Sequence, residues 1–383
     1  MIAFVQPFAL HSPGGGSRVL RSLLQREHPP VLSLCTGMLT PTSSPDVEEI
    51  HLPTRPSFGR LELTRFQSYL RILDGVFRSR FEARLRSVIQ QRNIRLLHIL
   101  AHAYELVPAY NVASQLNLPF FLTVHDDLEY LSGGHPATDQ MLATLAEAWR
   151  RAKGIFVISE EMGKEYAARY GQREYLTVTD GIAAAAAAPL PRPARSLRVY
   201  FMGLFHGRYR ANFRALLDAL KTVRQQRPDW EISVVCRCGS IFGEVKADDV
   251  PVKILPFASE SEVEKDLLSA DLLYQPLPFE ADAVNLGRFS LSTKLVTYLG
   301  TGLPILYHGP SETAANKLLA SHDAAVLCTS LDPAEIAVQL VAAVDRRETI
   351  VNNALQLARQ RFMLADQQRR FWQPIEAALE VQS

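Results

Sequence analysis

The chain has 383 residues, of which 47% are hydrophobic and 21% charged, and its formal net charge at pH 7 is +1. This length predicts two domains, each with a sizeable core. The near-neutral charge argues against nucleic acid as a partner, because nucleic-acid binding requires a basic surface. The first residues lack the basic segment and long apolar run of a signal peptide, and no apolar run is long enough to span a membrane. We therefore expect a cytoplasmic protein.

The four cysteines are Cys35, Cys236, Cys238 and Cys328. Two of them lie close together in an apolar, strand-like run, but no second cysteine pair or histidine cluster completes a metal site. We therefore expect structural thiols, no bound metal and no cofactor. Sparse cysteine also fits a reducing compartment.

Short apolar strands alternate with amphipathic helices in the first half of the chain. The predicted strands are Ile2–Val5, Val31–Leu34, Leu96–Leu100, Phe120–Val124, Ile155–Ile158 and Tyr175–Val178. The helical patterns between them include a long basic region from about Leu61 to Gln91. Strands that alternate with helices predict a parallel sheet covered on both faces.

The alternation breaks in the middle of the chain. Residues 183–188 are an unbroken alanine run, and three prolines follow, at 189, 191 and 193. Alanine favours helix and proline ends it, so residues 183–197 are predicted to be a spacer. The predicted domains are therefore residues 1–182 and 198–360, with a last helix in 361–383.

The same alternation returns in the second half. The predicted strands are Val199–Met202, Ile232–Cys236, Val252–Leu255, Leu272–Gln275, Ile305–Tyr307 and Ala325–Cys328. The predicted helices are Ala211–Gln226, Glu260–Ser269, Thr293–Leu299, Ala334–Val344 and Asp366–Leu379. The pattern thus predicts an α/β protein with two doubly wound, Rossmann-like domains. Such domains bind ligands at the carboxyl ends of their strands, so we expect a cleft where the two domains face each other.

The first candidate site is the glycine-rich segment Gly14-Gly15-Gly16 with Arg18, between the first strand and a helix. Glycines there let a ligand approach the backbone and the free N–H groups of the helix. The spacing is not GxGxxG, so it does not favour a nicotinamide or flavin cofactor. The alternative interpretation is a plain loop.

The second candidate is His125, at the end of the strand Phe120–Val124. A histidine at the carboxyl end of a parallel strand can orient a hydroxyl group or take part in proton transfer. Asp126 beside it would either meet substrate or cap the following helix. His102 follows the strand Leu96–Leu100 and is a secondary candidate. The alternative is a structural histidine that is bonded to the backbone.

The third candidate is Gly203 with Arg208 and Arg210, which follow the first strand of the second domain. A glycine bend followed by arginines before a helix suits a diphosphate, because guanidinium groups bind phosphate oxygens in pairs. Solvated surface arginines are the alternative.

The fourth candidate is Lys294, in the first turn of a helix that Ser292 and Thr293 are expected to cap. A lysine normally avoids this position because the helix dipole already places positive charge there. An anion that binds both the lysine and the free N–H groups would explain it. A lysine and arginines that converge from two loops would stabilise a leaving diphosphate as its charge develops.

The order and spacing of these segments resemble GT-B glycosyltransferases, closest to glycosyltransferase family 4. The resemblance covers nearly the whole chain. It is carried by the Gly14–Gly16 loop, Thr123-Val-His125-Asp126, Val157-Ile-Ser159-Glu160, Thr179-Asp180-Gly181-Ile182, Met202-Gly203 with its arginines, and Ser292-Thr-Lys294-Leu-Val-Thr-Tyr298 before Gly302-Leu-Pro304.

The resemblance implies transfer of a sugar from a nucleotide donor with retention of configuration and without a required metal. It implies acceptor binding in the first domain, nucleotide binding in the second, and a last helix, around Gln367–Leu379 with Trp372, that crosses back to the first domain. His125 resembles the histidine beside the donor sugar, and Arg208 or Arg210 resembles the residues that bind diphosphate. Lys294 looks like part of a variant signature loop of envelope-polysaccharide transferases.

One departure from the family concerns its two glutamates, which stand eight positions apart before the Gly-x-Pro element. Here the second position is Thr297, and the first falls near Phe289. In the family the second glutamate holds the ribose and the first helps to hold the donor sugar. Thr297 can bond a hydroxyl group, though more weakly than a carboxylate. Glu280 and Asp282 lie upstream and are candidate replacements.

The region Arg55–Arg95 is strongly basic. It holds ten arginines (55, 60, 65, 71, 78, 80, 84, 86, 92 and 95) against Glu62, Asp74 and Glu82, with apolar residues between them. A basic amphipathic helix in an acceptor domain would dock on an anionic inner leaflet, which suits a lipid-linked acceptor. A solvated helix face over an ordinary core stripe is the alternative.

The sequence therefore predicts a glycosyltransferase that moves a sugar from a nucleotide diphosphate sugar to a glycan, a lipid-linked glycan or another hydroxyl acceptor of envelope polysaccharide synthesis. A non-catalytic binding protein on the same fold is one alternative, favoured by the missing glutamates. A nucleotide-sugar epimerase, which needs no acceptor, is another.

Overall fold

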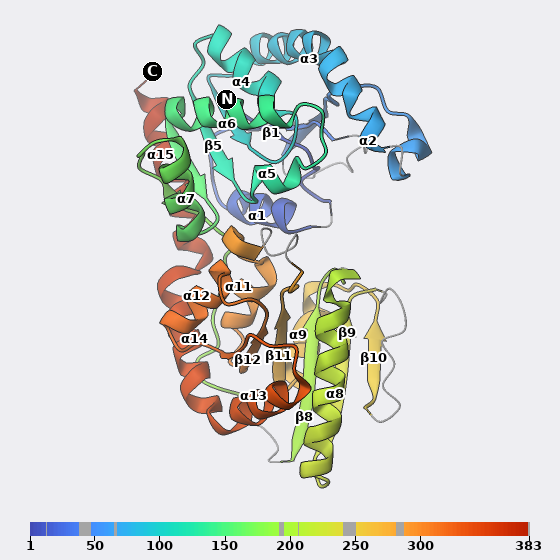
Figure 1. Cartoon of the computed structure of the whole chain (residues 1–383). Coiled ribbons are helices and arrows are strands. Elements are labelled where there is room, and N and C mark those ends of the chain that lie inside the picture. Colours follow the sequence, from blue (N-terminus) through green and yellow to red (C-terminus); the bar gives the residue numbers. More distant parts are fainter. Residues whose placement is uncertain are drawn as a thin grey trace. The chain divides into compact units, whose positions relative to one another are not determined.

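A computed structural model (Figure 1) describes residues 1–12, 14–37, 47–64, 67–190, 195–205, 207–239, 250–280 and 287–381. The chain divides into two compact units: unit 1 is Met1–Asp180 with Leu364–Ser383, and unit 2 is Gly181–Met363. Each unit is built on one parallel sheet with helices, as the alternating pattern predicts.

The sheet of unit 1 has seven strands in the order β3-β2-β1-β4-β5-β6-β7. The order steps outward from β1 in both directions, which is the doubly wound arrangement. Most of its central strands are buried at every position, as expected of parallel strands covered on both faces. The strands are β1 (Ile2–Gln6), β2 (Val31–Cys35), β3 (Glu48–His51), β4 (Leu96–Leu100), β5 (Phe120–Val124), β6 (Gly154–Val157) and β7 (Leu176–Thr177).

Helices form two layers in unit 1. One layer includes α3 (Ile72–Gln91), α4 (Leu106–Gln115) and α6 (Thr138–Arg151), which contact one another in sequence. In another, α1 (Gly15–Leu24) packs against α15 (Leu364–Glu380). The remaining elements are η1 (Gly59–Leu63), α2 (Gln67–Leu70), α5 (Leu128–Leu131) and α7 (Glu160–Tyr170).

The C-terminal helix α15 completes the core of unit 1. Its Trp372 is fully buried, stacks on His28 at 5.1 Å between ring centres, and donates from Nε1 to the carbonyl oxygen of Leu23 over 2.8 Å. The neighbouring Phe371 meets Phe4 of β1 edge to face at 6.0 Å. Large aromatic side chains account for much of the burial in a core, so α15 is an integral part of unit 1.

The sheet of unit 2 has six strands in the order β10-β9-β8-β11-β12-β13, and their pairings are also parallel. The strands are β8 (Ser196–Met202), β9 (Glu231–Arg237), β10 (Val252–Leu255), β11 (Leu272–Pro276), β12 (Ile305–His308) and β13 (Val326–Cys328). The helices are η2 (Gly207–Tyr209), α8 (Arg210–Gln226), α9 (Glu260–Ser269), α11 (Thr293–Leu299), α12 (Ala314–Ser321), α13 (Pro333–Asp345) and α14 (Arg347–Arg361). Two apolar clusters, one on each face of the sheet, form its core.

In the described part of the chain, β3, α12 and α14 were not expected from the sequence. Strand β3 is half exposed and carries two glutamates, so it lacks the apolar run of its neighbours. Helix α12 has only eight residues, and α14 carries polar side chains on several sides. Their buried faces are determined by packing in unit 2, so the sequence pattern did not indicate them.

The alanine run 183–188, which lies in the predicted spacer, is irregular and not helical despite the helix propensity of alanine. The segment bonds to other parts of unit 2: the N–H of Ala186 donates to the carbonyl oxygen of Gly300 over 2.8 Å, and the N–H of Leu190, just after the run, donates to that of Gly302 over 3.1 Å. A run this short forms no stable helix alone, so these contacts decide its conformation.

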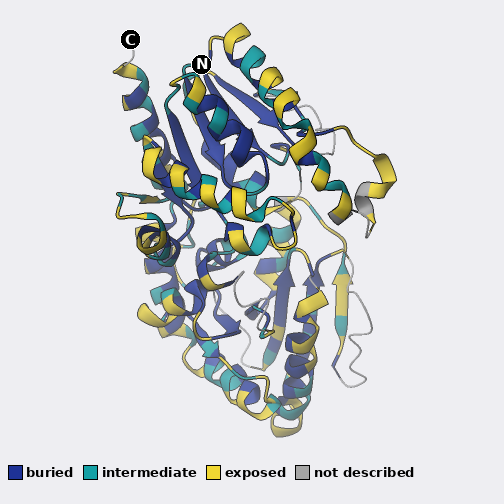
Figure 2. Cartoon of the chain, turned by 45° about the horizontal axis from the view of Figure 1, so that its top comes forward, coloured by how far each residue is buried: buried dark blue, intermediate teal, exposed yellow. Residues whose placement is uncertain are grey.

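Figure 2 shows the strands of both sheets as mostly buried, whereas the outer faces of many helices are exposed. In the described part of the chain, none of the helices combines the length and apolar character needed to cross a membrane. The four cysteines are buried and form no disulfide. Burial raises the pKa of the Cys35 thiol to about 11, which fits the expected structural thiols.

The turn after β8 depends on Gly203. Its φ angle is +99°, a conformation that side-chain-bearing residues rarely adopt. A Cβ atom placed there would lie 3.3 Å from Cε of Lys294, on helix α11. The bare glycine backbone therefore lets the lysine side chain pass closely over the end of β8.

We expect Gly203→Ala to lower the free energy of unfolding by about 1–3 kcal/mol, because it combines a strained φ angle with a close contact. Urea unfolding measures this change. Gly207→Ala is the matched control, since a Cβ atom there meets nothing within 4 Å and its φ angle is not positive. Equal losses in the two variants would contradict the role assigned to Gly203.

Candidate active site

In unit 2, the ammonium group of Lys294 lies over two aromatic rings. Nζ of Lys294 is 4.4 Å from the ring centre of Phe201, in β8, and 5.5 Å from that of Tyr209, in η2. Both aromatic side chains are buried. The ring faces attract the ammonium group, but they replace little of the hydration that it loses.

Burial lowers the pKa of Lys294 to about 7, and the nearby Cys238 offsets this shift only partly. A lysine with its ordinary pKa would be fully charged at neutral pH. At pH 7 the charged and neutral forms are therefore nearly equally populated, because the aromatic surroundings desolvate the ammonium group. An anion bound beside Nζ would restore the charged form.

Arg208 and Arg210 lie on either side of Tyr209, at the point where η2 passes into α8. Both arginines are exposed, whereas Tyr209 is buried beneath Lys294. The structure thus brings Lys294, the Gly203 turn and the two arginines to the carboxyl end of β8. This is the end of a parallel sheet at which ligands bind.

The helix that carries Lys294 is fixed by Tyr298, whose hydroxyl oxygen accepts a hydrogen bond from the N–H of Met202 over 3.1 Å. Ser292 is the N-cap residue, but its side chain makes no capping bond, contrary to expectation. The hydroxyl group of Thr297 donates to the carbonyl oxygen of Thr293 over 3.2 Å, within the same helix.

The two candidate replacements for the family glutamates lie upstream of this helix. Glu280 is exposed and follows β11. Asp282 lies outside the described residues.

In unit 1, His125 follows the end of β5 and is buried. Burial lowers its pKa to about 4; the charge of Asp126 opposes this shift and that of His102 adds to it. His125 is therefore neutral at pH 7, with one ring nitrogen as a donor and the other as an acceptor. It can orient a hydroxyl group but does not add a positive charge.

His102 and Asp126 come together, as their positions after neighbouring strands imply. Nδ1 of His102 lies 3.7 Å from Oδ2 of Asp126. The N-cap of α5 is Asp127 and not Asp126, since Asp127 accepts from the N–H of Glu129 over 3.3 Å. Asp126 is thus left facing His102, at the same edge of the sheet as His125.

The loop Gly14–Gly16 is linked to His102 by the ring of Phe8, which contacts both. A Cβ atom on Gly16 would lie 2.7 Å from the Phe8 ring, and the ring meets His102 edge to face at 5.9 Å. Gly14 is the N-cap of α1 with a φ angle of +145°, and Gly15 is the first residue of the helix. The loop therefore needs its glycines in part for packing.

One buried acid was missed from the sequence. Glu105 is 2% exposed, and burial raises its pKa to about 8. One carboxyl oxygen accepts from the N–H of Ala103 over 3.0 Å. The position of Glu105, a few residues after the carboxyl end of β4, is the sequence signal that could have identified this acid. Phe201, near the end of β8, and Tyr209, in η2, were also missed, because buried aromatic residues look like ordinary core.

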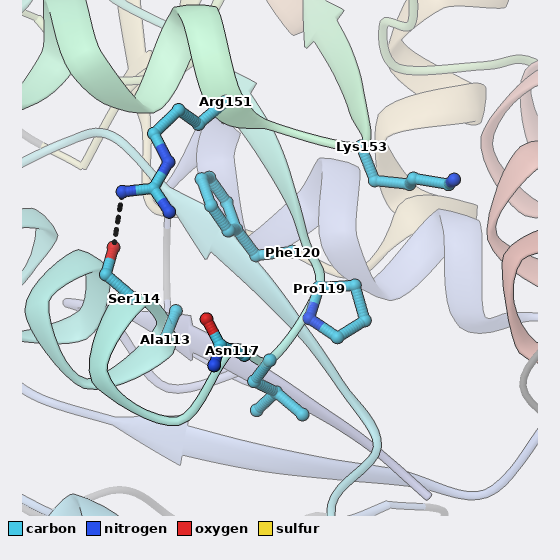
Figure 3. Close-up of a pocket in the computed structure, with 8 residues that line it drawn as sticks. Ala113, Ser114, Asn117, Pro119, Phe120, Arg151 and Lys153 are labelled. Atoms are coloured by element: carbon cyan, nitrogen blue, oxygen red, sulfur yellow. Dashed lines mark hydrogen bonds between the residues drawn. The ribbon is translucent and has the colours of Figure 1, made fainter.

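A cavity of about 210 Å³ lies elsewhere, at the amino end of β5 (Figure 3). Arg151 and Lys153 border it, and Arg151 donates to Ser114 over 3.5 Å. His125 follows the other end of the same strand, so this cavity is separate from the site that the motifs predict. Among the described residues, no group of three His, Cys, Asp or Glu side chains is placed to hold a metal ion.

Comparisons with known proteins agree with this architecture. Residues 14–181 match the family model of the glycosyl transferase 4-like domain. No curated protein sequence matches the chain.

Several solved structures are similar over nearly the whole chain. Alr3699/HepE from Anabaena, in complex with UDP, has 16% identity and a TM-score of 0.67, with 98% of this chain and 99% of that chain covered. An α,α-trehalose-phosphate synthase from Burkholderia xenovorans, in complex with glucose-6-phosphate, has 11% identity and a TM-score of 0.68, with 98% and 100% covered. The trehalose-6-phosphate synthase OtsA has 12% identity and a TM-score of 0.65, with 97% of both chains covered.

Identities this low establish the fold and leave the substrate open. The recognition made from the motifs is nevertheless confirmed. The chain has the GT-B fold of glycosyltransferases, and its residues 14–181 are similar to the glycosyl transferase 4-like domain.

Proposed function

We propose that the chain is a retaining, metal-independent glycosyltransferase that takes a sugar from a uridine diphosphate sugar. The acceptor would be a hydroxyl group of a glycan or lipid-linked glycan in envelope polysaccharide synthesis, at the cytoplasmic face of a membrane. The observation that carries the proposal is the desolvated Lys294 beside the Gly203 turn. Uridine is favoured as the base because HepE binds UDP.

Lys294, Arg208 and Arg210 would bind the diphosphate in unit 2. During transfer the bond between the sugar's anomeric carbon and the diphosphate oxygen breaks, and a bond to the acceptor oxygen forms. The acceptor proton leaves with the diphosphate, whose charge grows as the first bond lengthens. Cations at this position, above all the desolvated Lys294, would stabilise the growing charge more than they stabilise the ground state, which would accelerate the reaction.

His125 and its neighbours would position the sugar and acceptor in unit 1. Since His125 is neutral, it would donate or accept one hydrogen bond to a sugar hydroxyl. His102, Asp126 and Glu105 add acceptor oxygens and nitrogens at the same sheet edge. Such a group suits a hydroxyl-rich ligand better than an anionic one, because it combines carboxyl groups with a neutral histidine and includes no lysine or arginine side chain.

A non-catalytic binding protein is the second candidate. Thr297 favours it, because a hydroxyl group already bonded within its own helix is a weaker ribose ligand than the carboxylate of related enzymes. Such a protein would bind UDP without consuming a UDP-sugar.

Lys294→Ala tests the diphosphate assignment. We expect the variant to bind UDP about 10–100-fold more weakly, since a hydrogen bond to a charged group contributes about 1.5–3 kcal/mol. Binding of uridine, which has no phosphate, should stay within about threefold. Calorimetry measures both affinities. Lys317→Ala, an exposed lysine on α12, is the control. Equal losses for UDP and uridine would refute the phosphate role.

His125→Ala tests the assignment to the sugar. UDP affinity should remain unchanged, whereas hydrolysis of UDP-glucose, the side reaction of a transferase, should slow by about 100-fold or more. His322→Ala in unit 2 should leave the rate unchanged. Wild-type hydrolysis in the His125 variant would make this histidine structural. UDP binding without any hydrolysis or transfer in the wild type would favour the binding protein.

A further inference from the structure

Three large apolar side chains are exposed on one face of a helix in unit 1. Tyr69 is 69% exposed, Ile72 54% and Val76 69%. Arg71, which joins α2 to α3, has helical angles of φ −61° and ψ −23°, so the two helices form one nearly continuous rod. Spacings of three and four residues then place the three side chains on the same face. Figure 2 shows this rod as largely exposed.

The opposite face of the rod packs into unit 1. Asp74, Phe81, Leu85 and Ile89 are its buried residues. The exposed apolar side chains of Tyr69, Ile72 and Val76 therefore do not belong to the face of the rod that packs into the core. Phe58 and Leu61, 42% and 46% exposed, add apolar surface just before the rod. Exposed apolar surface on this scale marks an interaction site.

Arginines continue the same face. Arg80 is one helical turn beyond Val76, Arg84 follows one turn later, and both are exposed. Within the described ranges, no ion pair is recorded for either of them. The nearby acids are engaged elsewhere: Asp74 is buried, and Glu82 pairs with Arg78 at 3.8 Å. The outer face is thus apolar at one end and positively charged at the other.

We propose that this outer face, defined by Tyr69, Ile72, Val76, Arg80 and Arg84, docks on an anionic lipid surface. The apolar side chains enter the headgroup region, and the arginines bind lipid phosphates. Charge complementarity selects this partner, because the face offers a single sign of charge. An exposed helix ridge also fits a planar surface. Arg65, part of the basic region predicted to bind membranes, lies outside the described residues.

The inner face of the rod connects the docking surface to the candidate acceptor residues. Oδ1 of Asp74 accepts from the hydroxyl group of Thr54 over 2.7 Å, and its Oδ2 lies 3.4 Å from Nε2 of His135. Tyr104 stacks on His135 at 5.5 Å, and Glu105 follows it. Docking would therefore place the lipid near the sheet edge that carries Glu105, which is useful to a lipid-linked acceptor. This last point rests on the proposed function, whereas the docking itself does not.

Vesicle co-sedimentation tests the proposal with the full chain. Vesicles of phosphatidylglycerol and phosphatidylcholine in equal parts should bind the protein, phosphatidylcholine alone should bind it much more weakly, and added salt should release it. Removing both charges with Arg80→Gln/Arg84→Gln should weaken binding about 25-fold, since each arginine contributes about fivefold. Ile72→Ser/Val76→Ser should weaken it by about tenfold or more.

Matched controls separate this face from general surface effects. Lys164→Gln/Lys253→Gln removes the same number of exposed charges elsewhere, and Val338→Ser removes an apolar side chain that is 64% exposed on α13. Both controls should bind vesicles as the wild type does, and every variant should keep its UDP affinity, which confirms folding.

Three outcomes would overturn the proposal: no binding to anionic vesicles at low salt, wild-type binding by both outer-face variants, or lipid-free dimers that Ile72→Ser/Val76→Ser disrupts. The last result would assign the face to a protein partner. A wild type that binds vesicles but not UDP would refute the donor assignment alone, so the two failures are distinguishable.

Discussion

The desolvated ammonium group of Lys294 constrains the residues at the carboxyl end of β8 in unit 2. Position 203 favours glycine because its φ angle is +99° and Cε of Lys294 lies 3.3 Å from the Cβ position. Tyr298 fixes the helix that carries the lysine to the end of β8, and Phe201 forms the surface beneath its Nζ. A half-buried lysine whose ammonium group is desolvated lowers stability when no anion is present, because desolvation disfavours its charged form. These surroundings therefore favour an anionic ligand as the counterion of Lys294.

The candidate residues of unit 1 have a different chemistry. Its sheet edge gathers the neutral His125, the His102–Asp126 pair and the buried Glu105, none of which provides a permanent positive charge. Unit 2 offers cations and unit 1 offers hydrogen-bonding groups for hydroxyls. This division fits the two substrates of the proposed transferase, an anionic donor and a polyhydroxylated acceptor, and in both units the candidate residues lie at the carboxyl ends of the strands.

The sequence predicted the elements whose patterns are local and strong. The apolar runs of β4, β5 and β10 were placed to the residue, and helix α11 with Lys294 was predicted with its observed bounds. Features set by tertiary contacts could not be predicted. The irregular course of the alanine run depends on contacts such as the hydrogen bond from Ala186 to Gly300, and the rings beneath Lys294 come from distant residues. The sequence pattern indicated an anion site at Lys294, but the lowered pKa of this lysine depends on the rings around it and could not be predicted.

Proton uptake on UDP binding is the most direct test of the Lys294 site. At pH 8.5 a lysine with a pKa of about 7 is almost entirely neutral, and a bound diphosphate should return its pKa to about 10 or above. Calorimetry in buffers of different ionisation enthalpy should then show uptake of about one proton per UDP, and affinity should fall about tenfold per pH unit above pH 7. Lys294→Met should bind UDP weakly and without uptake. UDP binding by the wild type with no proton uptake, or with the same uptake in the variant, would contradict the central role of Lys294.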